Sequence, residues 1–511
     1  MTPAPSPTVA PSPTVDRASR PPRPHALDVL ATVLDPGSFQ SWDVPMSEPD
    51  AGPDYPDQLA RASQKSGLDE SVVTGEGRLD GRRVAVAATE FSFLAGSIGS
   101  AASERLTLAF ERATAEGLAL LASPSSGGTR MQEGTPAFVQ MVKIGQAVAA
   151  HRRAGLPYLV YLRHPTTGGV LASWGSLGHL TVAEPGALIG FLGPRVREII
   201  KGESFPEGVQ TAENLTRRGI IDGIVPLPEL RSVAIAALEV LMSPQEPVGE
   251  HSDGSVDDAR PAWSSVEATR RPDRPGLREL LTHATTTFIP LRGTGSGESD
   301  LTVILGLARF CGVSCVLVGQ DRQAQEDSSL GPAALRVAQR GFALAQELDL
   351  PLITVIDTPG ADLSTESENG GMAGEIARCL ASLATVEVPV VSIILGEGTG
   401  GGALAFLPAD RTVCAENGWI APLPPEGASA IVYRDDSKAA QMAESHHIRA
   451  VDLVAMGAVD EIVPERPDAA EEPEQFCRRI AGATAAHLRD LLAQPRDERL
   501  AARQDRYRRM R

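Results

Sequence analysis

Aromatic side chains are scarce, making up only 4% of the 511 residues, so Ala, Val, Leu and Ile must fill most of any core. Gly and Pro are frequent instead, at 49 and 40 residues. This composition favours α/β units joined by glycine turns over a β-sandwich. The length favours two large domains over one.

Cysteine is also scarce, and an odd count of five excludes a disulfide framework and indicates a reducing compartment. Only Cys311 and Cys315 are close in sequence, and without a second pair we expect no metal site. The chain has no run of 18 or more apolar residues, which argues against a membrane-spanning helix. Its start lacks the basic-then-apolar order of a signal peptide, so we expect a cytoplasmic protein.

Positive charge is in deficit, because the net charge is −18 and the isoelectric point is near 5.0. A general nucleic-acid binder needs a basic surface, so this class is not expected. A local cluster of Arg or Lys could still bind an anionic small molecule.

Composition divides the chain into five segments. Residues 1–60 are rich in Pro, Ser and Thr and are predicted to form a disordered arm, and 244–273 resemble a linker. Between and after them we expect an N-terminal domain at 61–243 and a C-terminal domain at 274–495. The Arg-rich segment 496–511 is expected to be a solvated helical tail.

Two blocks of the chain repeat one order of elements. In each, an apolar strand ends in a glycine turn, a helix follows, and a second strand ends in another glycine turn. The four strands are expected at 118–123, 158–162, 352–356 and 388–395. Gly127 and Gly360 are 233 residues apart, and so are Gly168 and Gly401, which indicates an internal duplication of βα units.

A glycine turn that opens a helix leaves backbone N–H groups free to bind a phosphate or a developing oxyanion. No lysine follows these turns with Walker spacing, and no G-x-S-x-G elbow is present. Gly396, Gly398 and Gly401 match a dinucleotide fingerprint only weakly. Two to four oxyanion sites without a nucleophile suit enolate chemistry. Close packing of helix against strand is the alternative explanation of the glycines.

Several segments resemble acetyl-CoA carboxylase carboxyltransferase, a member of the acyl-CoA carboxylase β-chain family. The first half resembles the bacterial β subunit at 91–100 (FSFLAGSIGS), 126–134 (SGGTRMQEG), 165–170 (PTTGGV) and 183–194 (AEPGALIGFLGP). From Arg274 onward the chain resembles the α subunit, at 356–361 (IDTPGA), 396–405 (GEGTGGGALA) and 457–465 (GAVDEIVPE). The resemblance covers roughly residues 75 to 465.

The resemblance implies two tandem crotonase-like (ClpP/crotonase) α/β domains. It implies transfer of a carboxyl group from carboxybiotin, borne by a biotin carboxyl carrier protein, to acetyl-CoA or another short acyl-CoA. The product would be malonyl-CoA, in the first step of fatty acid synthesis. A biotin carboxylase would be a further partner, no biotin would be bound covalently to this chain, and a homodimer or larger homo-oligomer is expected. A malonyl-thioester decarboxylase, a propionyl-CoA carboxylase β chain and a non-catalytic scaffold remain alternatives.

The resemblance also implies roles for individual residues. Gly127 and Gly128 would supply one oxyanion hole, and Gly402 and Ala403 the other. The residues expected to bind substrate are Gly168 and Gly169 in the first pocket, Arg130 at the CoA phosphates, Gly401, and Ala405, at a position linked to acyl choice.

Overall fold

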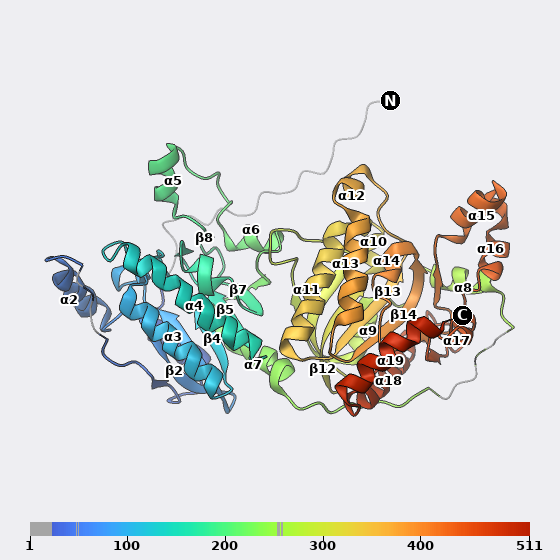
Figure 1. The fold of residues 1–511 in the computed structure, drawn as a ribbon, viewed down its shortest axis with the longest axis horizontal. Helices are drawn as coiled ribbons and strands as arrows, with labels where there is room; N and C mark the ends of the chain where they lie inside the picture. The colour runs from blue at the N-terminus through green and yellow to red at the C-terminus, as the bar shows by residue number, and fades with distance from the viewer. Residues whose placement is uncertain (1–22, 47–48, 50, 253–255, 257–258, 511) are drawn as a thin grey trace.

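The computed structural model describes residues 23–46, 49, 51–252, 256 and 259–510. Two α/β halves lie side by side, each built on one mixed sheet (Figure 1). No helix within these described ranges is both long enough and apolar enough to cross a bilayer.

The N-terminal sheet has seven strands. In spatial order they are β1 (Gln40–Ser41), β2 (Val72–Leu79), β3 (Arg82–Thr89), β4 (Ala119–Ser123), β5 (Tyr158–Leu162), β7 (Leu180–Ala183) and β9 (Gly223–Ile224). The pairings β1–β2 and β2–β3 are antiparallel, and the others are parallel. Every residue of β4 and β5 is buried, as expected for parallel strands covered on both faces.

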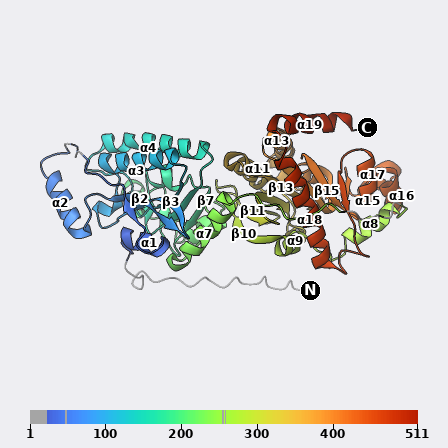
Figure 2. The same cartoon turned by 90° about the horizontal axis from the view of Figure 1, so that it is seen from below.

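Helices cover both faces of this sheet (Figure 2), with α3 (Ser100–Ala115) and α4 (Thr135–Arg153) on one and α1 (Ala26–Val33) and α7 (Leu227–Met242) on the other. Successive residues of β3 alternate accordingly: Val84 and Val86 pack in the cluster with α1 and α7, and Ala85 in the cluster with α3. The remaining elements of this half are α2 (Tyr55–Ser66), a 3-10 helix (Leu94–Gly96), β6 (Thr166–Thr167), a π-helix (Leu171–Gly175), β8 (Ile189–Gly190), α5 (Pro194–Lys201) and α6 (Ala212–Arg217).

The C-terminal sheet repeats this topology. Its order is β10 (Thr285–Leu291), β11 (Val303–Phe310), β12 (Val313–Gln320), β13 (Leu352–Thr358), β14 (Val390–Thr399), β15 (Arg411–Ala415) and β17 (Glu461–Val463), with β16 (Trp419–Ala421) paired to the end of β14. Its helices are α8 (Ala262–Thr269), α9 (Leu277–Ala284), α10 (Arg322–Gln325), α11 (Pro332–Leu348), α12 (Thr365–Asn369), α13 (Met372–Thr385), α14 (Gly400–Leu404), α15 (Pro425–Tyr433), α16 (Ala439–Ser445), α17 (Ala450–Ala455), α18 (Pro473–Leu492) and α19 (Arg496–Arg509). The predicted α/β duplication is therefore confirmed, and all four predicted strands are present.

The offset between the repeats is 232 residues, one fewer than predicted. Parallel bridges join Ser126 to Thr166 and, at equivalent positions, Thr358 to Gly398. Both first turns also share one hydrogen bond, from the glycine N–H to the hydroxyl two residues earlier: Gly128 to Ser126 at 3.0 Å and Gly360 to Thr358 at 3.1 Å. Because each turn contains neighbouring glycines, glycine spacing alone did not distinguish the two registers.

The two halves share a core. Helix α7 packs on the first sheet and also contacts β10, β11 and β12, so one hydrophobic cluster includes side chains of both halves. Two ion pairs cross the same junction: Arg152 donates to both carboxylate oxygens of Glu347 at 2.7 Å, and Arg340 donates to the buried Asp222 at 2.8 Å.

The arm predicted to be disordered over 1–60 is ordered in its described part, whereas residues 1–22 lie outside the described residues. Its helix α1 buries Ala26, Val29, Leu30 and Val33, which recur at helical spacing, and the Ala26 N–H donates to Glu90 at 2.8 Å. High Pro and Ser content obscured this short amphipathic pattern.

The predicted linker 244–273 packs on the C-terminal half. The N–H groups of Glu246 and Val248 donate to Gly312 and Cys311 at 3.0 and 2.8 Å. Helix α8 shares a hydrophobic cluster with Trp419.

The predicted solvated tail is helical, as α19, but it is not fully solvated. Arg499 and Arg503 are buried, and Arg503 donates to both carboxylate oxygens of Asp410, at 2.8 and 2.5 Å. Its guanidinium also donates to the carbonyls of Val386 and Val388. Composition shows that this segment is positively charged, but it does not show that Asp410, a buried carboxylate, pairs with one of its arginines.

Replacing Arg503 by Ala should lower the free energy of unfolding by about 3–5 kcal/mol, because Asp410 would lose its main counter-ion inside the protein. Urea denaturation measures the change. Arg509→Ala is the matched control on the same helix, since its side chain is 79% exposed, and it should change stability by less than about 0.5 kcal/mol. Equal effects of the two substitutions would contradict the buried pairing.

Candidate functional site

The first glycine turn of the N-terminal half follows β4. Its two predicted oxyanion donors already have acceptors: the Gly127 N–H donates to Ala95 at 2.9 Å, and the Gly128 N–H to Ser126 Oγ. Within the described residues, the N–H of the next residue, Thr129, has no acceptor. Ile98 bonds the carbonyl of Gly128 and the N–H of Arg130, so the Thr129 N–H points away from Ile98.

The second turn of this half meets the first. A Cβ atom added to Gly128, whose φ is +107°, would lie 3.3 Å from Gly168 Cα and from Gly169 N. A Cβ on Gly169 would lie 2.9 Å from Thr129 Oγ1. The Gly169 N–H has no acceptor among the described residues. Gly128, Gly168 and Gly169 thus lie close together, and the N–H groups without an acceptor are those of Thr129 and Gly169.

The C-terminal half builds the equivalent pocket. A Cβ on Gly402 would lie 3.4 Å from the N atom of Ala361, which is the counterpart of Thr129. Gly401 and Gly402 belong to the first turn of α14, whose N–H groups have no partner within the helix, and Thr399 provides no side-chain cap. Gly401 and Gly402 thus have N–H groups without a partner in the helix, and Gly402 lies next to the amide of Ala361.

The predicted catalytic residues lie on turns that are not equivalent. Gly127 and Gly128 belong to a first turn, and Gly402 and Ala403 to a second, and each pocket needs a turn of both kinds. Ala403 and Ala405 are fully buried in the shared hydrophobic cluster, so their side chains lie behind the pocket rather than at its surface. The predicted role of Ala405 in acyl choice would have to act through packing.

Charged groups missed in the sequence flank the C-terminal pocket. Asp357, three residues before Gly360, is buried; burial raises its pKa to about 6, although Arg322 and Arg274 oppose the shift. Its Oδ1 accepts the Glu397 N–H at 3.2 Å. The segment IDTPGA contained this acid, but only the fold shows that it is enclosed.

A second charged group at this pocket is Arg270, from the segment predicted as a linker. It pairs with Glu397 at 3.2 Å and with Glu426 at 2.6 Å. Thr399, which precedes α14, donates its hydroxyl to the same Glu397 at 3.2 Å. Strand β14 and helices α8 and α15 thus meet through these charges beside the glycine turn.

Arg130 does not have the predicted role of contacting substrate phosphates. It is 1% exposed, and its guanidinium donates to Glu70, Ser71 and the Ser97 carbonyl. Tyr55 accepts a further hydrogen bond from it at 3.1 Å. Arg130 thus holds the first turn in place through buried hydrogen bonds, and Glu70 neutralises its charge.

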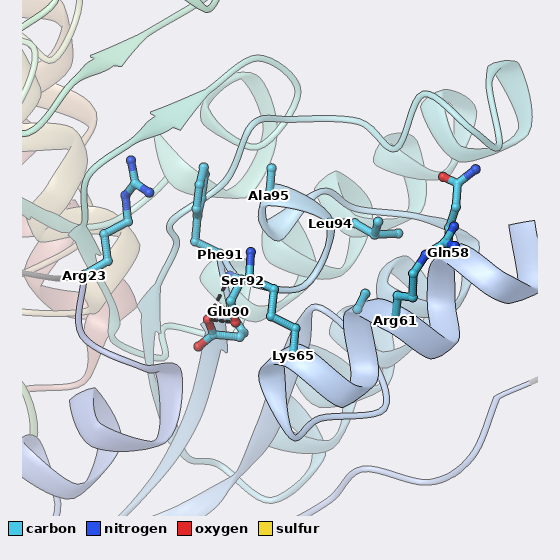
Figure 3. Close-up of a pocket in the computed structure, with 10 residues that line it drawn as sticks. Arg23, Gln58, Arg61, Lys65, Glu90, Phe91, Ser92, Leu94 and Ala95 are labelled. Carbon is cyan, nitrogen blue, oxygen red and sulfur yellow. Dashed lines mark hydrogen bonds between the residues drawn. The ribbon is translucent and has the colours of Figure 1, made fainter.

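Basic side chains instead line a cavity of about 510 Å³ beside the first turn (Figure 3). Arg61 and Lys65 come from α2, and Arg23 lies 4.2 Å from the Phe91 ring centroid. The cavity wall includes Ala95, whose carbonyl accepts the Gly127 N–H. The sequence analysis missed these cations because they lie in or next to the arm predicted to be disordered.

Replacing Asp357 by Asn should stabilise the protein at pH 8 by up to about 3 kcal/mol. Between pH 4 and 6 the folded protein keeps a proton that the unfolded chain has lost, so the wild type loses stability as the pH rises through this window. The variant has no charge to bury there. Urea denaturation should show the advantage shrinking towards pH 4.5, and a difference independent of pH would contradict the raised pKa.

Residues 27–502 match the family model of the carboxyl transferase domain. The chain is 60% identical over 483 residues to a probable biotin-dependent acyl-coenzyme A carboxylase beta3 subunit of Mycobacterium tuberculosis (strain ATCC 25618 / H37Rv), covering 94% of this chain and 97% of that protein. It is 37% identical over 507 residues to the acetyl-coenzyme A carboxylase carboxyl transferase subunits beta/alpha of Salinispora arenicola (strain CNS-205), covering 94% and 89%.

The fold is similar to that of transcarboxylase 12S, with a TM-score of 0.71 at 20% identity over 92% of this chain and 90% of that one. This likeness confirms the expected crotonase-like α/β architecture. Since the family match extends across both halves and both pockets, the chain belongs to the carboxyl transferase domain family and is a carboxyltransferase.

Proposed function

We propose that this chain is the carboxyltransferase subunit of a biotin-dependent acyl-CoA carboxylase. It takes the carboxyl group of carboxybiotin, delivered by a biotin carboxyl carrier protein that a biotin carboxylase has charged. The acceptor is a short acyl-CoA. The observation that carries this proposal is the pair of pockets in which two glycine turns gather unpaired backbone N–H groups.

Two such pockets suit a reaction with two oxyanions. Loss of CO2 from carboxybiotin would leave negative charge on the ureido oxygen, and the ureido nitrogen would then take the α-proton of the acyl group. The resulting enolate, with its charge on the thioester oxygen, would attack the CO2. Fixed backbone dipoles stabilise such charges without reorganisation, and no protein nucleophile is required. One pocket would serve biotin and the other the thioester.

The cavity of Figure 3 is the proposed site for the phosphates of CoA. Arg23, Arg61 and Lys65 offer three positive charges at its walls, in a protein whose net charge is −18. Because the cavity adjoins the first turn of the N-terminal half, the thioester of a bound acyl-CoA would lie near Thr129 and Gly169.

We propose acetyl-CoA as the acyl acceptor and malonyl-CoA as the product, supplied to fatty acid synthesis. The 37% identity to the acetyl-coenzyme A carboxylase chain of Salinispora arenicola supports this choice. Propionyl-CoA is the second candidate, because the relative at 60% identity is described only as an acyl-coenzyme A carboxylase.

We also propose that the chain works as a homodimer or a larger homo-oligomer. Helix α4 exposes apolar side chains, with Phe138 63% and Val142 62% exposed, and α15 exposes Ile431 at 69%. Adjacent apolar side chains of this size favour burial against another chain. Such an assembly would bring the N-terminal pocket of one chain to the C-terminal pocket of another.

The test is the reverse reaction on the purified chain: loss of malonyl-CoA, with and without biocytin. Loss that requires biocytin supports the carboxyltransferase proposal, and methylmalonyl-CoA in place of malonyl-CoA then tests the acyl group. Loss that proceeds equally well without biocytin would favour a malonyl-thioester decarboxylase. Failure with both biocytin and a biotinylated carrier protein would contradict the proposal.

Gly402→Ala should lower the turnover number by about 10²–10³, the usual effect of losing one oxyanion donor. The added methyl group would lie 3.4 Å from Ala361 N and would cover that N–H, while its other neighbours leave room for it. Gly223→Ala is the matched control, because its methyl group would meet only Val182, at 3.9 Å. Both variants should keep the wild-type melting temperature within a few degrees, and wild-type turnover of Gly402→Ala would refute the assignment.

Arg61→Ala combined with Lys65→Ala should raise KM for malonyl-CoA about tenfold or more while leaving the turnover number near wild type. The reason is that these side chains would contact phosphates far from the reacting atoms. Malonyl-pantetheine contains none of those phosphates, so its KM should not change. The exposed Arg153 provides a control substitution, Arg153→Ala, with no expected effect. An equal rise in KM with both thioesters would contradict the proposal that this cavity binds the phosphates of CoA.

A further inference from the structure

Two histidines and two carboxylates meet on the C-terminal half, away from both glycine pockets. His251 lies in the segment between the halves, Glu461 begins β17, and His487 and Asp490 project from α18. Nitrogen and oxygen atoms of His251, Glu461 and His487 all lie within 4.8 Å of one another. Carboxyl transfer as proposed above makes no use of these residues.

The centre of this cluster is Glu461 Oε2. It lies 2.7 Å from His251 Nδ1 and 2.9 Å from His487 Nε2. His487 is only 7% exposed, and its Nε2 is buried without a hydrogen-bond partner among the described residues, since its direction towards Glu461 does not suit a hydrogen bond. His487 Nε2 and Glu461 Oε2 are thus two potential ligand atoms that lie 2.9 Å apart without a hydrogen bond between them.

Further contacts fix the orientation of the other two side chains. His251 Nε2 lies 3.0 Å from Asp490 Oδ2, which leaves Nδ1 on the side of Glu461. The second oxygen of Glu461 accepts the N–H of Ser252. A carboxylate behind a histidine is the usual outer support of a metal-bound imidazole, because it fixes the tautomer.

We propose that His251 Nδ1, His487 Nε2 and Glu461 Oε2 bind one divalent transition-metal ion, with Zn²⁺ the best match and water in a fourth position. Two imidazoles and one carboxylate form a common ligand set for tetrahedral zinc. Ligands about 2.0–2.2 Å from such an ion are roughly 3.3 Å apart, so only small side-chain movements are needed.

The three proposed ligands come from separate parts of the chain. Because His251 belongs to the segment that joins the halves, the bound ion would fasten this segment to β17 and α18.

The test uses the tag-free full chain, stripped with EDTA and returned to metal-free buffer. Titration with Co²⁺ should produce the visible absorption band of a tetrahedral ion, saturating at one equivalent per chain, and Zn²⁺ should abolish the band. Zn²⁺ should also raise the melting temperature by several degrees. Absence of both the band and the temperature shift in the wild-type chain would overturn the proposal.

Variants identify the ligands. His487→Gln and His251→Gln should each abolish the Co²⁺ band. His251 is partly exposed, so its substitution is the easier of the two for the fold to accommodate. Asp490→Asn should weaken Co²⁺ binding 10- to 100-fold. His446→Gln is the matched control, an exposed histidine outside the cluster that should leave binding unchanged. Undiminished binding in folded His251→Gln would overturn the assignment. None of these readouts depends on carboxyltransferase activity, so they stand apart from the tests of the proposed function.

Discussion

The contact between two glycine turns is the constraint on which both pockets depend. In each half, neighbouring parallel strands end in turns that lie in contact. The contact is tightest at Gly128, where an added Cβ would lie 3.3 Å from Gly168 Cα and where the φ of +107° also disfavours a side chain. This contact requires the strands to be adjacent and parallel, as β4–β5 and β13–β14 are. Sheet order, helix placement and the direction of the free amides follow from it.

Sequence alone predicted what local pattern encodes. Apolar runs and the glycine turns that end them predicted the four central strands, the duplication and the positions of the turns. Such patterns depend only on residues that are close together in the sequence. The same information left the register uncertain by one position, because Gly127 and Gly128 are equally plausible partners for Gly360. The matching bridges and hydrogen bonds of Ser126 and Thr358 distinguish them.

Other features depend on pairs far apart in the chain. Arg130 resembled a surface cation by its motif, but Glu70, 60 residues earlier, binds it internally. Arg23 and Arg61 became visible as cavity residues only once α1 and α2 were seen to be folded. The expectation of no metal site rested on cysteine spacing, and the proposed ligands His251 and Glu461 are 210 residues apart. No local periodicity links such positions, since burial and long-range packing create them.

The pairing of Arg503 with Asp410 also affects the order in which the two halves can fold during translation. Asp410 immediately precedes β15, and its partner follows 93 residues later. At translation rates of about 5–20 residues per second, the strand waits roughly 5–20 s before that arginine exists. During this interval the nascent C-terminal half carries an acidic group that it cannot bury, while the N-terminal half has all its residues. The second repeat would therefore mature last.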